Sequence, residues 1–172
     1  VQHIPCATAG YSPQPEDFGR FLCRFFDLWY TQAIEWMRVR LFDSLILHIL
    51  DNGHFDCTFG TRCDEYTVVE HNGDVYPCDF FVEKAWRLGN LMETPIEKLA
   101  ASPLRQDFAA RKRKKSDKCL ICRWNELCCG GCPKDRLAAG SWTELSCFCQ
   151  AYKMFFEHAM PKLTAIAAEM AR

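Results

Sequence analysis

The sequence has neither a long apolar run nor an excess of one charge. Its 172 residues contain no stretch of about 18 consecutive apolar residues, the length that crosses a membrane. The N-terminal segment lacks the basic region, apolar core and cleavage site of a secretory signal peptide. The formal net charge is -1, whereas nucleic-acid binding relies on a basic face. We therefore expect a cytoplasmic protein that binds neither membrane nor nucleic acid.

An initial methionine and a complete first domain are also missing. The segment VQHIPC predicts a short buried strand, the stretch from Pro15 predicts an amphipathic helix, and VRLFD (residues 39–43) predicts a second strand. One strand–helix–strand unit is too small to fold alone. We therefore expect residues 1–56 to be the end of a larger α/β domain whose beginning is missing.

After residue 57 the clearest signal is a β-hairpin. The segment YTVVEHNGDVYPC consists of two β-rich runs around Asn72-Gly73, a pair that suits a two-residue type I′ turn. Such a turn sets Thr67 opposite Cys78 and brings Cys63 to the same end of the hairpin.

Helix signals follow the hairpin. Residues 94–97 have capping-box spacing, and Ser102-Pro103 opens a second short helix. Residues 150–171 predict an amphipathic C-terminal helix, kinked near Pro161. The expected fold class is α+β.

Cysteine is abundant, with 12 residues. Without a secretory signal, clustered cysteines favour metal ligation over disulfides. Zinc-finger and zinc-ribbon spacings are absent, and Gly130 and Gly131 suit a loop folded tightly around inorganic sulfide. Spacing alone leaves zinc, iron–sulfur clusters and disulfides open. Eight cysteines are enough for two four-ligand sites: Cys57, Cys63, Cys78, Cys119, Cys122, Cys128, Cys132 and Cys149.

Several motifs resemble one enzyme family. VEHNGDVYPCDFFVE, LCCGGCPKDR and CQAYKMFFEH are similar to the anaerobic sulfatase-maturating enzymes, often named arylsulfatase regulators. These are radical S-adenosylmethionine (SAM) enzymes with a SPASM domain, an extension that carries two auxiliary [4Fe-4S] clusters. PEDFGRFLCRFFDLWY and VRLFD resemble the last elements of their (β/α) barrel. The resemblance implies a barrel remnant over residues 1–56 and a SPASM domain over residues 57–172.

The resemblance also implies which cysteines act together. The first auxiliary cluster would be held by Cys57, Cys63, Cys78 and Cys132. The second would be held by Cys119, Cys122, Cys128 and Cys149. The family assigns nothing to the other four, of which the last competes for the place of Cys149: Cys6, Cys23, Cys129 and Cys147.

The implied reaction is oxidation of a sulfatase cysteine or serine to Cα-formylglycine. It needs a radical made from SAM at a third [4Fe-4S] cluster, and a reductant such as flavodoxin or ferredoxin. Asp79 would accept the substrate proton. The radical-generating Cys-x3-Cys-x2-Cys motif is absent, because Asp135 stands where a third cysteine would follow Cys128 and Cys132. We therefore expect the third cluster and SAM in the missing N-terminal part, and no activity from this piece alone.

Two alternatives to this function remain open. A SPASM domain of another peptide-modifying radical enzyme would share every one of these cysteines. A zinc-binding interaction module would use the same thiols without any redox chemistry.

Overall fold

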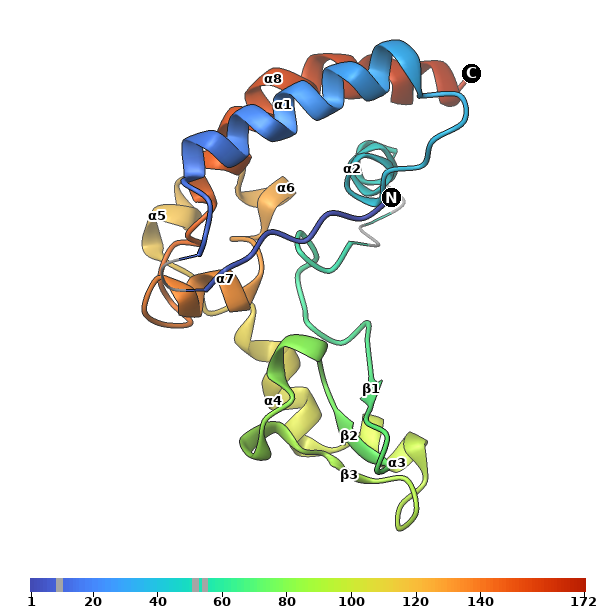
Figure 1. The fold of residues 1–172 in the computed structure, drawn as a ribbon, viewed down its shortest axis with the longest axis vertical. Coiled ribbons are helices and arrows are strands. Elements are labelled where there is room, and N and C mark those ends of the chain that lie inside the picture. Colours follow the sequence, from blue (N-terminus) through green and yellow to red (C-terminus); the bar gives the residue numbers. More distant parts are fainter. Residues whose placement is uncertain (9–10, 51–52, 54–55) are drawn as a thin grey trace. The chain divides into compact units, whose positions relative to one another are not determined.

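Helices α1 (Pro15–Gln32) and α8 (Cys149–Met170), far apart in sequence, lie side by side (Figure 1). In this computed structural model, residues 1–8, 11–50, 53 and 56–172 are described. The chain divides into two units: unit 1 comprises Val1–Gly60 and Lys115–Arg172, and unit 2 comprises Thr61–Lys114. These units follow packing, and the expected domain boundary at residue 57 stays a prediction.

The contact between α1 and α8 is largely aromatic. The buried residues of α1 recur every three or four positions and so share one face, as the sequence predicted. Phe26 meets Phe155 of α8 edge to face, with ring centroids 6.0 Å apart. Gly19 allows the backbones to approach, because a Cβ there would lie 3.2 Å from the Cα of Ala151.

Helix α2 (Arg40–Ile49) occupies the position of one predicted strand. The strand prediction for residues 39–43 is wrong, because a short apolar run cannot by itself distinguish a buried strand from a buried helix. The residues that follow decide: Leu41, Leu45 and Ile46 continue a helical period and are buried. Phe42 packs between α1 and α8, 5.7 Å from the ring of Phe155.

The segment VQHIPC also forms no strand in the structure. The N-terminal amine of Val1 donates to the carbonyl of Arg38, and the N–H of Arg40 donates to the carbonyl of Val1 at 3.0 Å. This is the hydrogen-bond pattern of parallel strands at a single position. The predicted strand is therefore wrong as an element, and a partial barrel stays a prediction.

Three short helices carry the cysteine-rich segment of unit 1: α5 (Asp117–Leu120), α6 (Asn125–Cys128) and α7 (Pro133–Ala138). The predicted C-terminal helix is confirmed as α8, which continues through Pro161. Within the described residues, no helix combines the length and apolar character needed to cross a membrane.

Unit 2 contains a three-stranded antiparallel sheet, ordered β1 (Val68–Val69), β2 (Asp74–Tyr76), β3 (Gly89–Asn90). Its helices are the 3-10 turns η1 (Asp79–Phe81) and η2 (Lys84–Trp86), then α3 (Ile96–Ala100) and α4 (Pro103–Arg111). Phe108 of α4 is buried between Phe81 and Trp86, at ring distances of 5.1 and 5.0 Å. The predicted hairpin and both predicted short helices are confirmed.

The register of the hairpin differs from the prediction by one residue. Val68 pairs with Tyr76, so continuing this register sets Thr67 opposite Pro77 and not opposite Cys78. The turn contains three residues, since the N–H of Glu70 donates to the carbonyl of Asp74 at 2.9 Å. Such a loop needs a single left-handed residue, whereas a type I′ turn needs two.

Glycine and asparagine therefore have different tasks in this turn. Gly73 adopts a φ of 85°. Asn72 instead accepts a hydrogen bond on its side-chain oxygen from the N–H of Asp74 at 3.0 Å. The dipeptide correctly located the turn, but an asparagine that bonds to its own backbone suits more than one turn type.

We expect Phe26→Ala to destabilise the chain by about 3–5 kcal/mol, because the substitution leaves a cavity in the α1–α8 core. Phe21→Ala is the matched control: it removes the same ring from the same helix, but Phe21 is 51% exposed, so its expected cost is under about 1 kcal/mol. Urea unfolding monitored by circular dichroism measures both. Equal losses would show that this face is not the core.

Candidate metal centre

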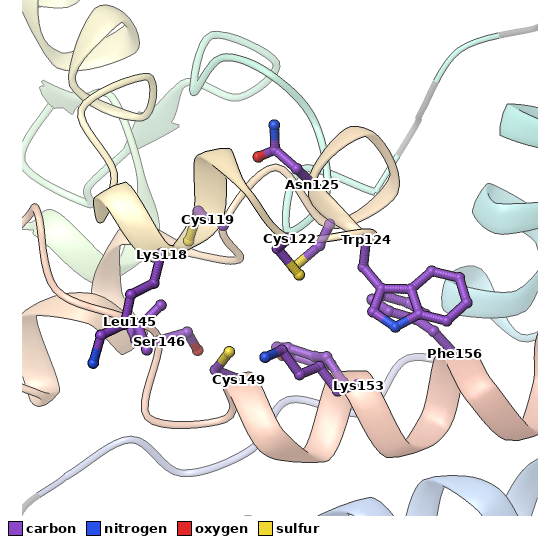
Figure 2. A pocket seen from close by; sticks show the side chains of 13 residues that line it. Lys118, Cys119, Cys122, Trp124, Asn125, Leu145, Ser146, Cys149, Lys153 and Phe156 are labelled. Carbon is purple, nitrogen blue, oxygen red and sulfur yellow. The ribbon is translucent and has the colours of Figure 1, made fainter.

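Cysteines from separate segments of unit 1 line one cavity (Figure 2). The cavity contains about 550 Å³ of space not filled by protein atoms, including its opening. Its lining thiols are Cys119, Cys122, Cys128 and Cys149. These are the residues expected for the second site. Cys132, which is closer in sequence to the first three, is not among the described residues that line the cavity.

Local backbone structure directs these thiols before any metal is considered. Cys119 lies in α5, and the N–H of Cys122 donates to its carbonyl at 3.2 Å. Cys149 is the first residue of α8, and its N–H donates to the carbonyl of Ser146 at 2.9 Å. In Figure 2 the sulfur of Cys149 faces those of Cys119 and Cys122 across the cavity. Packing of α8 on α1 therefore fixes one wall of the site.

The loop between Cys128 and Cys132 has an unusual backbone. Three consecutive residues are left-handed, with φ values of 48° at Cys129, 78° at Gly130 and 70° at Gly131. Glycine adopts such angles without steric cost, while Cys129 is strained. The tight loop expected from the glycine pair is thus present.

A buried arginine fills the inside of this loop. Arg136 is 0% exposed, and its Nε donates to the carbonyl of Gly130 at 2.9 Å. Its Nη2 donates to the carbonyls of Cys129 and Gly131 at 2.9 and 3.1 Å. Sequence reasoning missed this residue because arginine is seldom fully buried. The available signal was its position one helical turn after Cys132.

Burial raises the pKa of the Cys128 thiol to about 12, an effect that a hydrogen bond from the Gly130 N–H opposes and the nearby Cys149 reinforces. Burial also raises the pKa of Cys149, which the positive charge of Lys153 opposes. Lys153 lies beside Cys149 in Figure 2, one turn further along α8, and was also missed. Because metals bind thiolates, loading this site must release protons.

The arrangement suits a cluster better than a single ion. Around zinc, thiolate sulfurs 2.3 Å from the metal lie only about 3.8 Å from one another. Among the described residues, no three His, Cys, Asp or Glu side chains are grouped closely enough to hold one ion. A cubane separates its thiolates further because each binds a different iron. Four thiols spread around one cavity are a donor set that fits such a cluster.

In unit 2, Arg105 acts on the backbone beside Cys63 and Cys78. Its Nη1 donates to the carbonyls of Cys63 and Pro77 at 3.0 and 3.3 Å, and its Nη2 donates to the carbonyl of Tyr66. Cys63 and Cys78 therefore come to the same end of the hairpin, as predicted. The other two residues expected for this set, Cys57 and Cys132, belong to unit 1.

Asp79, the expected proton acceptor, is exposed at the start of η1. The Sγ of Cys78 donates to its Oδ1 at 3.4 Å. Of the cysteines without an expected role, Cys129 is buried and donates to the carbonyl of Glu126 at 3.4 Å. Burial raises the pKa of Cys147 to about 11, and Cys147 is not among the described residues that line the cavity.

Comparison with known proteins agrees with this geometry. The SPASM family, described as an iron–sulfur cluster-binding domain, matches residues 57–123. The chain is 39% identical over 160 residues to a cysteine-type anaerobic sulfatase-maturating enzyme of Clostridium perfringens, covering 91% of this chain and 43% of that protein. It is 30% identical over 167 residues to a serine-type enzyme of Bacteroides thetaiotaomicron, covering 95% and 40%.

Solved structures show the same fold. Native anSMEcpe with bound AdoMet and the Cp18Cys peptide matches with a TM-score of 0.87 at 36% identity, over 98% of this chain and 50% of that one. A second structure, with bound AdoMet and the Kp18Cys peptide, matches with a TM-score of 0.84 at 37% identity, over 93% and 45%. The chain therefore spans half or less of the length of these relatives.

We expect Gly130→Ala to destabilise the chain more than Gly53→Ala. Both glycines have a similar φ, 78° and 75°, so the backbone cost of an added Cβ is matched. At Gly130 the Cβ would lie 2.7 Å from Nη2 of Arg136, whereas no described atom lies within 4 Å at Gly53. Overpacking adds about 1–3 kcal/mol, which denaturant unfolding can resolve. Equal losses would contradict a loop closed tightly on Arg136.

Proposed function

We propose that this chain, which belongs to the anaerobic sulfatase-maturating enzyme family, is the auxiliary-cluster part of an enzyme that oxidises a sulfatase cysteine or serine to Cα-formylglycine. The observation that carries the proposal is the cavity lined by Cys119, Cys122, Cys128 and Cys149. It supports a cluster site in a chain whose relatives are named for sulfatase maturation.

We assign two [4Fe-4S] clusters to the chain. The second is held by the four cysteines of the cavity. The first is held by Cys57, Cys63, Cys78 and Cys132, a set supported by family resemblance and by the hairpin geometry at Cys63 and Cys78. When bound, such clusters accept and pass on single electrons.

Asp79 is the proposed base of the reaction. Converting a Cβ–H and its thiol or hydroxyl to a carbonyl-type double bond removes one hydrogen atom, one proton and one electron. The hydrogen atom goes to the radical derived from SAM, the electron leaves through the auxiliary clusters, and the proton goes to the carboxylate of Asp79. An exposed carboxylate beside a cluster ligand can reach a substrate that lies over that cluster.

The proposed substrate is a sulfatase polypeptide, and the relatives with solved structures hold bound peptides. The third [4Fe-4S] cluster and SAM belong to the rest of the enzyme, as does the reductant, a flavodoxin or ferredoxin. Higher identity to the cysteine-type enzyme favours a cysteine target. A reducing cytoplasm would keep the 12 thiols available for iron.

Cysteine variants test the cluster assignment. The anaerobically reconstituted chain should contain about eight iron and eight sulfide, as two cubanes require, with broad absorption near ~400 nm. Cys149→Ala should reduce both contents to about four. Cys147→Ala, the matched control two residues away, should retain about eight. A colourless protein with two zinc ions would support an interaction module instead, and a Cys147→Ala loss with an intact Cys149→Ala would exchange their assignments.

Asp79→Asn tests the base in the full-length enzyme. Loss of a positioned base should lower the rate of formylglycine formation by about 10²–10⁴-fold on a peptide containing Cys-x-Pro-x-Arg, while iron content stays unchanged. Glu83→Gln, which neutralises another exposed carboxylate of unit 2, is the control. An unchanged yield in Asp79→Asn would remove it from the mechanism. No product from the wild type on cysteine or serine peptides would favour a different peptide-modifying enzyme.

A further inference from the structure

The loop around Arg136 connects a buried charge to a candidate cluster ligand through one peptide group. Arg136 Nη2 donates to the carbonyl of Cys129. The N–H of the same peptide group belongs to Gly130, and it donates to the sulfur of Cys128. The carbonyl and N–H of a trans peptide point in opposite directions. Fixing one end with the guanidinium therefore aims the other end at the sulfur.

The backbone angles make this arrangement depend on Arg136. Cys129, Gly130 and Gly131 are all left-handed, so their three carbonyls are turned towards the guanidinium and cannot take part in regular helix hydrogen bonds. Arginine presents several donors in a rigid planar fork, which can hold three carbonyls at once. A lysine ammonium carries the charge but lacks this geometry.

Hydrogen bonds to a ligand sulfur have a known physical consequence. They withdraw negative charge from the thiolate and favour the reduced cluster, and groups outside the ligand shell tune metals in this way. A cation bonded to the carbonyl polarises the peptide and strengthens the N–H as a donor.

We propose that Arg136 is a positioning residue that raises the reduction potential of the cluster held by Cys119, Cys122, Cys128 and Cys149. It acts by directing the Gly130 N–H onto the Cys128 sulfur. The inference rests on the proposed function, because it requires a cluster in this cavity. It assigns a task to a residue that neither binds the metal nor contacts the substrate.

The test measures midpoint potentials in the full-length protein by EPR-monitored redox titration. The signal that disappears in Cys149→Ala identifies the relevant cluster. In Arg136→Met the reduction equilibrium of this cluster should shift about tenfold towards the oxidised form, which corresponds to about 59 mV for one electron. Arg136→Lys should shift it in the same direction, because charge without the fork does not orient the loop.

Arg123→Met is the matched control. Arg123 lies in the same cysteine-rich segment, but its side chain is 71% exposed, so its loss should leave the potential unchanged. Arg136→Gln, which retains one side-chain N–H donor group, provides a further variant if the methionine form does not hold iron. An intermediate potential in Arg136→Gln supports the proposal.

Several results would overturn the inference. One is a wild-type potential in any Arg136 variant that retains full iron. Another is full retention of the potential by Arg136→Lys alone, which would point to charge without orientation. Loss of the cluster in all three variants would reduce Arg136 to a purely structural residue. Absence of iron from the wild type would instead refute the proposed function, so the two failures are distinguishable.

Discussion

The packing of α8 on α1 is the constraint on which the candidate centre depends. Cys149 begins α8, and the helix is fixed by buried aromatic side chains such as Phe155, which meets Phe26 of α1. The same helix supplies Tyr152 and Phe156 to the wall of the cavity. The stability of the helix pair and the position of a ligand are therefore one physical problem. A cluster that binds here finds Cys149 held by the core and does not have to order that segment itself.

Two buried arginines organise the remaining backbone. Arg136 holds the carbonyls of the loop between Cys128 and Cys132, and Arg105 holds carbonyls beside Cys63 and Cys78. In both cases a planar group with several donors satisfies carbonyls that irregular backbone would otherwise leave buried and unpaired. Irregular loops are needed because cysteines at uneven spacing cannot all converge from one regular helix. The arginines make such loops stable enough to serve as ligand frames.

Sequence reasoning succeeded where local chemistry is decisive. The period of apolar residues located α1 and α8, and Asn72-Gly73 located the hairpin turn. It failed where longer-range context decides: residues 39–43 became part of α2 because of the residues after them, and the hairpin register shifted because the turn has three residues. Spacing alone would have grouped Cys132 with Cys119, Cys122 and Cys128. Only the resemblance suggested Cys149, whose place depends on a helix contact that no local pattern contains. Arg136 was missed for the same reason.

The assignment of Cys128 and Cys132 to different clusters gives the loop between them a particular importance. Only three residues separate these ligands, and all three carbonyls between them bind Arg136. A displacement of the guanidinium would therefore move the Gly130 N–H at one end of the loop and the backbone leading to Cys132 at the other. On the proposed assignment, one buried cation then acts on the surroundings of both clusters at once. This shared loop, more than either ligand set alone, accounts for a cysteine pattern in which neighbours in sequence serve separate centres.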